Sequence, residues 1–177
     1  MTRQLTSAAM CAKEIRKELK TAFSGIKFSV TSSTFSMGNS VDINWTNGPT
    51  REAVETVTKK YQYGHFNGME DIYEYSNSRE ELPQAKFVMT QRDFTPELQL
   101  SAAQTAHKHY GGLDKQKLPE NMEDMNNNFD WNGNFFNWYN VSYQILNKLD
   151  LTGAVGVKED DDFESGAYYE GFKAVTA

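Results

Sequence analysis

Apolar residues recur at intervals of three or four between residues 6 and 22, which is the spacing of one face of an α-helix. Thr6 suits the N-cap of this helix, and Gly25 follows its end. Charged residues occupy the opposite side. The pattern predicts an amphipathic helix whose buried face is formed by Ala8, Ala12, Ile15, Leu19 and Ala22 or Phe23.

The apolar period changes to two after this helix. Apolar and polar positions alternate in residues 26–31, IKFSVT, and again in residues 41–45, VDINW. Such alternation is typical of strands with one buried face, whereas central parallel strands are apolar throughout. We therefore predict an antiparallel hairpin whose strands are joined by a long polar turn over residues 31–39.

The stretch DINWTNGPT, residues 42–50, ends the second strand. Asn47-Gly48 is a turn signal, and Pro49 suits the first turn of a helix, where its missing N–H is not needed. This helix is expected to run from residue 49 to about Tyr61, with Gly64 able to end it. We interpret the stretch as a joint between a strand and a helix, with a ligand-binding loop as the alternative.

The middle of the chain carries weaker signals. Residues 62–76 have no clean period, and a short strand near Asp71–Tyr75 is the element expected there. Residues 85–94, AKFVMTQRDF, predict a better strand with Phe87 and Met89 facing inward.

A strong helix start follows at Thr95-Pro96-Glu97, where a hydroxyl cap, an early proline and an acid near the positive end of the helix dipole coincide. This helix should span residues 96–110. Residues 113–134 are polar and are interpreted as a connection. A last, aromatic helix is expected over about 135–149, and residues 150–177 look irregular.

These elements predict an α+β fold with about three antiparallel strands packed with helices, followed by the aromatic helix and an acidic tail. The distribution of charged residues suggests the same division of the chain. Residues 1–111 carry 13 Lys and Arg against 12 Asp and Glu, whereas residues 112–177 carry 5 against 12. We therefore expect an α+β domain over residues 1–111 and an acidic extension over residues 112–177.

Composition limits the cellular setting. Aromatic residues make up 13% of the chain and must fill much of a core that is poor in aliphatic residues. Cys11 is the single cysteine, so no internal disulfide can form, and we expect it to be a small buried hydrophobe. The chain shows no signal-peptide core and no apolar run of membrane-spanning length, so we expect a cytoplasmic protein.

Catalytic and metal chemistry find little support. His65 lies near Glu70 and Asp71 in a glycine-containing segment, where a base with carboxylates could be catalytic, but no nucleophile motif accompanies it. His107 and His109 stand two apart in a predicted helix and point to different faces, which does not suit a zinc pair. No phosphate-binding glycine loop is present. We therefore expect no metal, no cofactor and no enzymatic activity.

Nucleic-acid binding is kept as an alternative. It needs a basic surface to neutralise phosphates, and the chain offers a modest patch with Arg92, beside Phe94, as a further contact. The patch consists of Lys13, Arg16, Lys17, Lys20 and Lys27. Acidic residues interleave with it and the isoelectric point is about 5.1, so direct binding is not the preferred interpretation.

The densest charge block is acidic and lies near the C-terminus. Carboxylates attract a basic partner, and aromatic side chains nearby can anchor it, which is the composition of a binding segment. The alternative is a solvated tail. The residues concerned are Glu159, Asp160, Asp161, Asp162 and Glu164, with the aromatic residues Phe163, Tyr168, Tyr169 and Phe172.

Several motifs in order resemble a known family, the large polyvalent protein associated domain of the twenty-ninth numbered type. The resemblance covers about residues 8–98. It is carried by Lys27–Val30, by Trp45–Pro49, by Phe66–Met69 with Asp71, and by Gln91-Arg92.

Two positions depart from the family pattern. Asn47 and Asn67 stand where the resemblance leads us to expect aspartates, which weakens any role in metal binding or catalysis. The resemblance implies an origin in phages, plasmids or conjugative elements, whose delivered proteins include suspected blockers of host defences. The resemblance therefore indicates the genetic setting of the protein but not its molecular activity.

The preferred hypothesis is a non-enzymatic accessory protein in the cytoplasm of a bacterial host. It would inhibit a host defence protein, as anti-CRISPR or anti-restriction proteins do, by covering a basic nucleic-acid-binding surface. The partner is expected to be such a protein or a nucleoprotein complex, with no membrane involved. Besides the acidic block, the candidate binding residues are His65, Phe66, Asp71 and Arg92. The alternatives are a nucleic-acid or nucleoprotein binding module and a hydrolase-like enzyme centred on His65 and Asp71.

Overall fold

The computed structural model describes residues 6–162 and 169–177. They form two compact units, which we call the N-terminal unit (6–45 and 51–93) and the C-terminal unit (46–50 and the described residues from 94 onward). The sequence suggested a division after residue 111. The units divide after Asp93 instead, because helix α3 (Pro96–His109) packs against elements that follow it in the chain.

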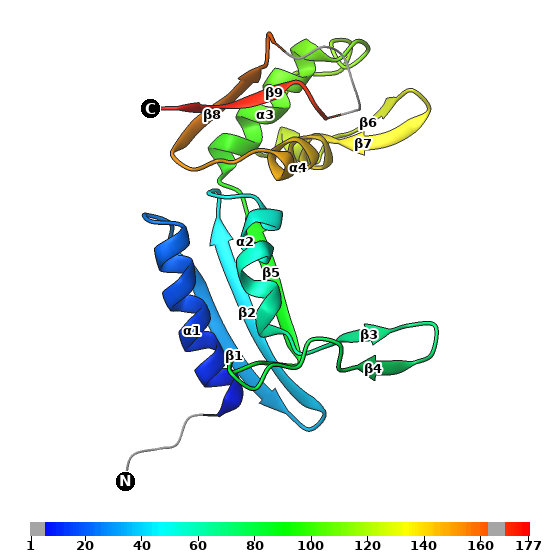
Figure 1. Ribbon diagram of the computed structural model, residues 1–177. Helices are drawn as coiled ribbons and strands as arrows, with labels where there is room; N and C mark the ends of the chain where they lie inside the picture. The colour runs from blue at the N-terminus through cyan, green and yellow to red at the C-terminus, as the bar shows by residue number, and fades with distance from the viewer. Residues whose placement is uncertain (1–5, 163–168) are drawn as a thin grey trace. The chain divides into compact units, whose positions relative to one another are not determined.

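The N-terminal unit contains a three-stranded sheet in the order β1-β2-β5. Strands β1 (Ser29–Phe35) and β2 (Gly38–Thr46) are antiparallel, with Val30 opposite Ile43. Strand β5 (Phe87–Asp93) runs in the same direction as β2, and the chain between them passes through a helix (Figure 1). The sheet is therefore mixed.

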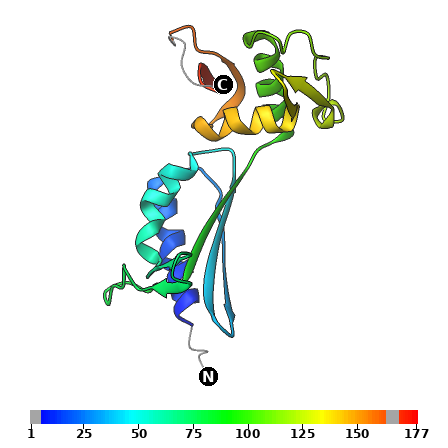
Figure 2. The ribbon, with the colours of Figure 1, turned by 90° about the vertical axis from the view of Figure 1, so that its right-hand side faces the viewer.

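Two helices cover one face of this sheet, as Figure 2 shows. Helix α1 (Ser7–Ala22) is capped by the Thr6 side chain, which accepts a hydrogen bond from the backbone N–H of Ala9. Helix α2 (Arg51–Thr58) continues into the 3₁₀ turn η1 (Lys59–Tyr61). The core between helices and sheet is formed by Cys11, Ala12, Ile15, Leu19, Val30, Val41, Ile43, Trp45, Val54, Tyr61 and Ala85.

Two expectations for this sheet were wrong. The first strand continues through Phe35, so the turn is short and not a long polar loop; β1 is an edge strand, and its Ser and Thr side chains can stay in water. Met89 is not inward but 52% exposed, whereas Val88 packs against the core. The prediction failed because residues 87–89 are all apolar, so no alternation distinguishes the inward face of β5.

Strands β3 (His65–Asn67) and β4 (Ile72–Glu74) pair as a short hairpin that projects from the N-terminal unit (Figure 1). Its turn includes Asp71, whose φ is 54°, in the left-handed region. The expected strand near residues 71–75 corresponds to β4.

The C-terminal unit packs α3 against helix α4 (Trp138–Lys148) and strand β8 (Ala154–Glu159). Strand β8 pairs antiparallel with β9 (Phe172–Thr176). The core joins Leu98, Ala102, Ala103, Ala106, Leu113, Met125, Trp138, Val141, Ile145, Leu146, Leu151, Val157 and Phe172, among others.

The sequence missed several elements of this unit. The supposed connection before α4 contains the 3₁₀ turn η2 (Asp124–Asn126) and strand β6 (Asn128–Trp131), which pairs with β7 (Asn134–Asn137). Phe135, expected at the start of the last helix, therefore lies in strand β7 and is 84% exposed. The supposedly irregular end contains β8 and β9.

The hairpin signal was present in Asn132-Gly133, whose φ values of 54° and 79° suit a tight turn. The α+β class itself is confirmed, with four α-helices and small sheets in the described residues. In that same part of the chain, no helix has the length and apolar character needed to cross a membrane.

Candidate interaction surfaces

The acidic block lies beside the β8–β9 pair of the C-terminal unit. Glu159 ends β8, and its Oε2 lies 3.5 Å from Nδ1 of His109. Asp160 Oδ1 accepts a hydrogen bond from Lys173 Nζ at 2.7 Å, and this bond lowers the pKa of Asp160 and raises that of Lys173. The side chain of Asp162 is 95% exposed and lies 3.9 Å from the same amine. Part of the acidic charge is thus already balanced within the fold.

The aromatic residues near this block differ in their surroundings. Tyr169 is partly buried, and its ring centroid lies 6.5 Å from that of Tyr110. Phe172 belongs to the core. The remaining predicted residues of the segment, Phe163, Glu164 and Tyr168, lie outside the described residues.

The β3–β4 hairpin brings several of the predicted residues together. His65 Nδ1 lies 2.9 Å from Ser76 Oγ, and Nε2 lies 3.5 Å from Glu74 Oε2, so the partner carboxylate of His65 is Glu74. The side chain of Asn67 donates to Glu74 and accepts from the backbone N–H of Met69, which fixes the turn.

The tip of the hairpin combines apolar and acidic side chains. Met69 is 99% exposed, Phe66 57% and Ile72 49%. Glu70 and Asp71 are exposed between them. Phe66 and Ile72 lie on opposite faces of the hairpin, because Phe66 pairs with Tyr73 and Ile72 pairs with Asn67. Exposed apolar side chains beside charge on a projecting turn make it a candidate interaction surface. We call residues 69–72, with Phe66, the hairpin tip.

The base of the hairpin is anchored by aromatic packing. The Tyr73 ring contacts Tyr63, Tyr75 and Phe87 at centroid distances of 5.8, 5.4 and 5.9 Å. Its hydroxyl donates to the backbone carbonyl of Lys86 at 2.5 Å, and burial raises its pKa to about 12. Lys86 Nζ lies 4.9 Å from the centre of the Tyr73 ring. These contacts hold the tip in a defined position on the N-terminal unit.

The basic residues divide between surface and core. Arg92 is 5% exposed, so little of it reaches the surface where a partner would meet it. Arg16, Lys17, Lys20 and Lys27 instead line a groove of about 830 Å³ at the end of α1. Its remaining lining is Phe23, Gly25, Ile26 and Phe28. We call it the basic groove. The sequence predicted the basic residues of this groove but not its apolar floor, because the floor depends on how the chain turns after α1.

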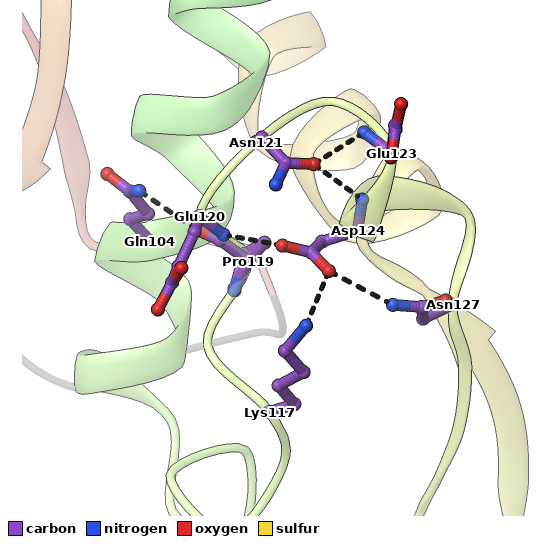
Figure 3. A network of polar contacts seen from close by, with 8 residues as sticks. All are labelled: Gln104, Lys117, Pro119, Glu120, Asn121, Glu123, Asp124 and Asn127. Carbon is purple, nitrogen blue, oxygen red and sulfur yellow. Dashed lines mark hydrogen bonds and ion pairs between the residues drawn. The ribbon is translucent and has the colours of Figure 1, made fainter.

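The Asp124 carboxylate organises a loop of the C-terminal unit (Figure 3). It accepts hydrogen bonds from Lys117 Nζ at 2.7 Å, from the Glu120 backbone N–H at 3.1 Å and from Asn127 Nδ2 at 3.4 Å. The bond from Lys117 is the main reason why the pKa of Asp124 lies below its usual value. These three donors to the Asp124 carboxylate all belong to the same loop, so we assign the network a structural role. Its polar sequence had suggested only a connection.

The described part of the chain does not bring together groups suited to metal or thiol chemistry. Within residues 6–162 and 169–177, no three His, Cys, Asp or Glu side chains gather in a way that could hold a metal ion. The Cys11 thiol is fully buried, and burial raises its pKa to about 12, which disfavours the reactive thiolate.

Comparison with known families adds the decisive context. Residues 6–95 match the family described as Large polyvalent protein associated domain 29. The chain belongs to this family. The match includes the hairpin tip and the basic groove, whereas the acidic block lies outside it. A member of this family is a protein associated with phages and mobile genetic elements. No curated protein and no solved structure matches the chain.

Proposed function

We propose that this domain-29 protein is a non-enzymatic accessory protein of a mobile element that binds and inhibits a host defence protein. It does so, as an anti-CRISPR or anti-restriction protein would, by covering a basic nucleic-acid-binding surface. The proposal is carried by one observation: an anchored hairpin presents Met69, Phe66 and Ile72 to solvent beside the carboxylates of Glu70 and Asp71.

The chemistry of the tip fits such a partner. Proteins that bind nucleic acid have basic clefts, and carboxylates approach these by the same electrostatic attraction that draws phosphates. Charge speeds the encounter, but lasting affinity comes from apolar side chains that bury on contact. The hairpin tip supplies both the carboxylates and the apolar side chains, through residues 69–72 and Phe66. Its aromatic base limits the conformational entropy that is lost on binding.

The acidic block of the C-terminal unit gives the proposal a second contact region. Asp161 and Asp162 are exposed, whereas Asp160 is paired with Lys173. A change of Asp161 and Asp162 to Asn therefore removes attractive charge without breaking the 2.7 Å contact. If the block steers the partner, this change weakens binding at low salt and has little effect at high salt, because exposed charges are screened.

A plasmid-transformation assay tests the proposal. Host strains that carry individual CRISPR or restriction systems receive a targeted plasmid, with the wild-type protein or a variant expressed beforehand. The hairpin variant carries Glu70→Lys and Asp71→Lys. Its matched control carries Glu80→Lys and Glu81→Lys, two exposed acids of the same unit outside the tip.

The wild type and the control should raise the transformation efficiency for at least one system, and the hairpin variant should not. The defence protein should also co-purify with the wild type from nuclease-treated lysate and be lost with the hairpin variant. Equal protection by the hairpin variant and its control, or no protection by the wild type against any system, would falsify the proposal.

A further inference from the structure

The basic groove is a preformed site that the proposed function does not use. Arg16 Nη2 donates to the carbonyl of Val30 at 2.6 Å, which fixes the guanidinium at one side. Lys17 reaches Glu14 only at 4.0 Å, and Lys20 and Lys27 form no ion pair with any residue that the structure describes. Two cationic side chains thus border an apolar floor without an acidic partner.

The floor of the groove favours apolar side chains over bases. The rings of Phe23 and Phe28 lie 5.8 Å apart at 48°, and Phe28 lies 5.6 Å from Trp45 at 47°. The tilted rings, together with Ile26, form an uneven floor and not one flat face on which a base could stack. Glu14 and Glu18 stand on the same helix, next to the groove, and line the adjoining pocket with Lys17. An extended phosphate backbone would run past these carboxylates and be repelled by them. A short acidic segment would end before it reaches them.

The groove therefore fits a short acidic segment that carries exposed aliphatic side chains. The hairpin tip of this chain has that chemistry, with Met69 and Ile72 beside Glu70 and Asp71. The N-terminal unit separates the two features in space. Figure 1 shows the hairpin projecting at the end of the N-terminal unit where α1 begins, and the groove lies at the other end of that helix, which is 16 residues or about 24 Å long. A tip can then meet a groove only on another copy.

We propose that the hairpin tip of one copy docks in the basic groove of a second copy, so that the protein associates head to tail. The contact is small, below the roughly 1,200 Å² of stable interfaces, so the association is weak and depends on concentration. Because one copy of such a pair keeps its groove unused and the other keeps its tip unused, the contact does not close on itself. The inference shares the hairpin tip with the proposed function but does not depend on a host partner.

Sedimentation equilibrium at low salt tests this with two charge-reversed variants of the full chain. The groove variant carries Lys20→Glu and Lys27→Glu, and the hairpin variant carries Glu70→Lys and Asp71→Lys. The control carries Lys13→Glu and Lys59→Glu, two exposed lysines of the same unit outside the groove. Wild type and control should associate, and each variant alone should lose at least tenfold in association constant. An equal mixture of the two variants should associate again, because opposite charges then meet at both contacts.

The proposal is overturned if the wild type stays monomeric, if either variant associates like the control, or if the mixture stays monomeric. Binding of single-stranded DNA or RNA by a monomeric wild type, lost in the groove variant, would assign the groove to nucleic acid instead. The groove variant should keep its protection in the transformation assay, since the tip is intact. Loss of self-association with protection retained therefore separates this inference from the proposed function.

Discussion

Gly64 positions the hairpin, and its replacement by alanine should displace the tip. A Cβ atom at this position would lie 2.0 Å from the carbonyl oxygen of Glu74 and 2.6 Å from Cε1 of Tyr73. The first neighbour is backbone, so it cannot move aside as a flexible side chain can. Strand β4 would have to shift by about an ångström to restore normal contact, and overpacking of this kind costs about 1–3 kcal/mol.

Gly68→Ala is the matched control, because its nearest neighbour would be Phe66 Cε1 at 4.0 Å. Hydrogen exchange of the backbone amides in β3 and β4 measures the effect locally, and the transformation and sedimentation assays measure it functionally. We expect Gly64→Ala to lose amide protection, host protection and self-association, while Gly68→Ala keeps all three. Equal amide protection in the two variants would refute the argument that Gly64 sets the position of β4.

Three further predictions concern stability and reactivity. The Cys11 thiol should react with Ellman's reagent at pH 8 only when urea unfolds the chain, because its pKa is raised to about 12; rapid reaction of the native protein would contradict its burial. Asp124→Asn should lower the free energy of unfolding at pH 7, and the difference from wild type should vanish at low pH. The folded-state pKa of Asp124 is depressed, so its contribution is present above the unfolded value and is lost as pH falls through the folded value; a pH-independent difference in urea titrations would exclude this. Ile145→Ala should cost about 2–5 kcal/mol in urea titrations, because its side chain is fully buried in the core of the C-terminal unit; a cost below about 1 kcal/mol would mean that the site collapses around the cavity.

The functional surfaces were only partly readable from the sequence. Motif order identified the family, and the segment from His65 to Asp71 was recognised as a candidate. The acidic block was preferred, yet the structure pairs Asp160 with Lys173, a residue 13 positions away. Such pairing depends on the β8–β9 register, which charge counting along the chain cannot reveal.

Local chemistry determined the helices of this protein. The period of three to four residues, the Thr6 cap and Pro96 in the first turn give α1 and α3 nearly their observed bounds, because these signals act within a few residues. The expected hydroxyl cap of α3 was wrong: Thr95 is at the N-cap, but its side chain forms no capping hydrogen bond and accepts one from Asn47 instead. The alternation at Val30 and Ile43 likewise found β1 and β2, since a half-buried hairpin needs only one apolar face.

Tertiary contacts decided what local patterns left open. The inward face of β5 and the strands on either side of the acidic block depend on partners distant in the sequence. The basic groove is lined by residues 16–28, which the turn after α1 brings together, and the ring of Phe28 in its floor packs against that of Trp45 in β2. Spacing along a chain records which side chains share a face, but the packing of one face on another is fixed by contacts between residues far apart in sequence.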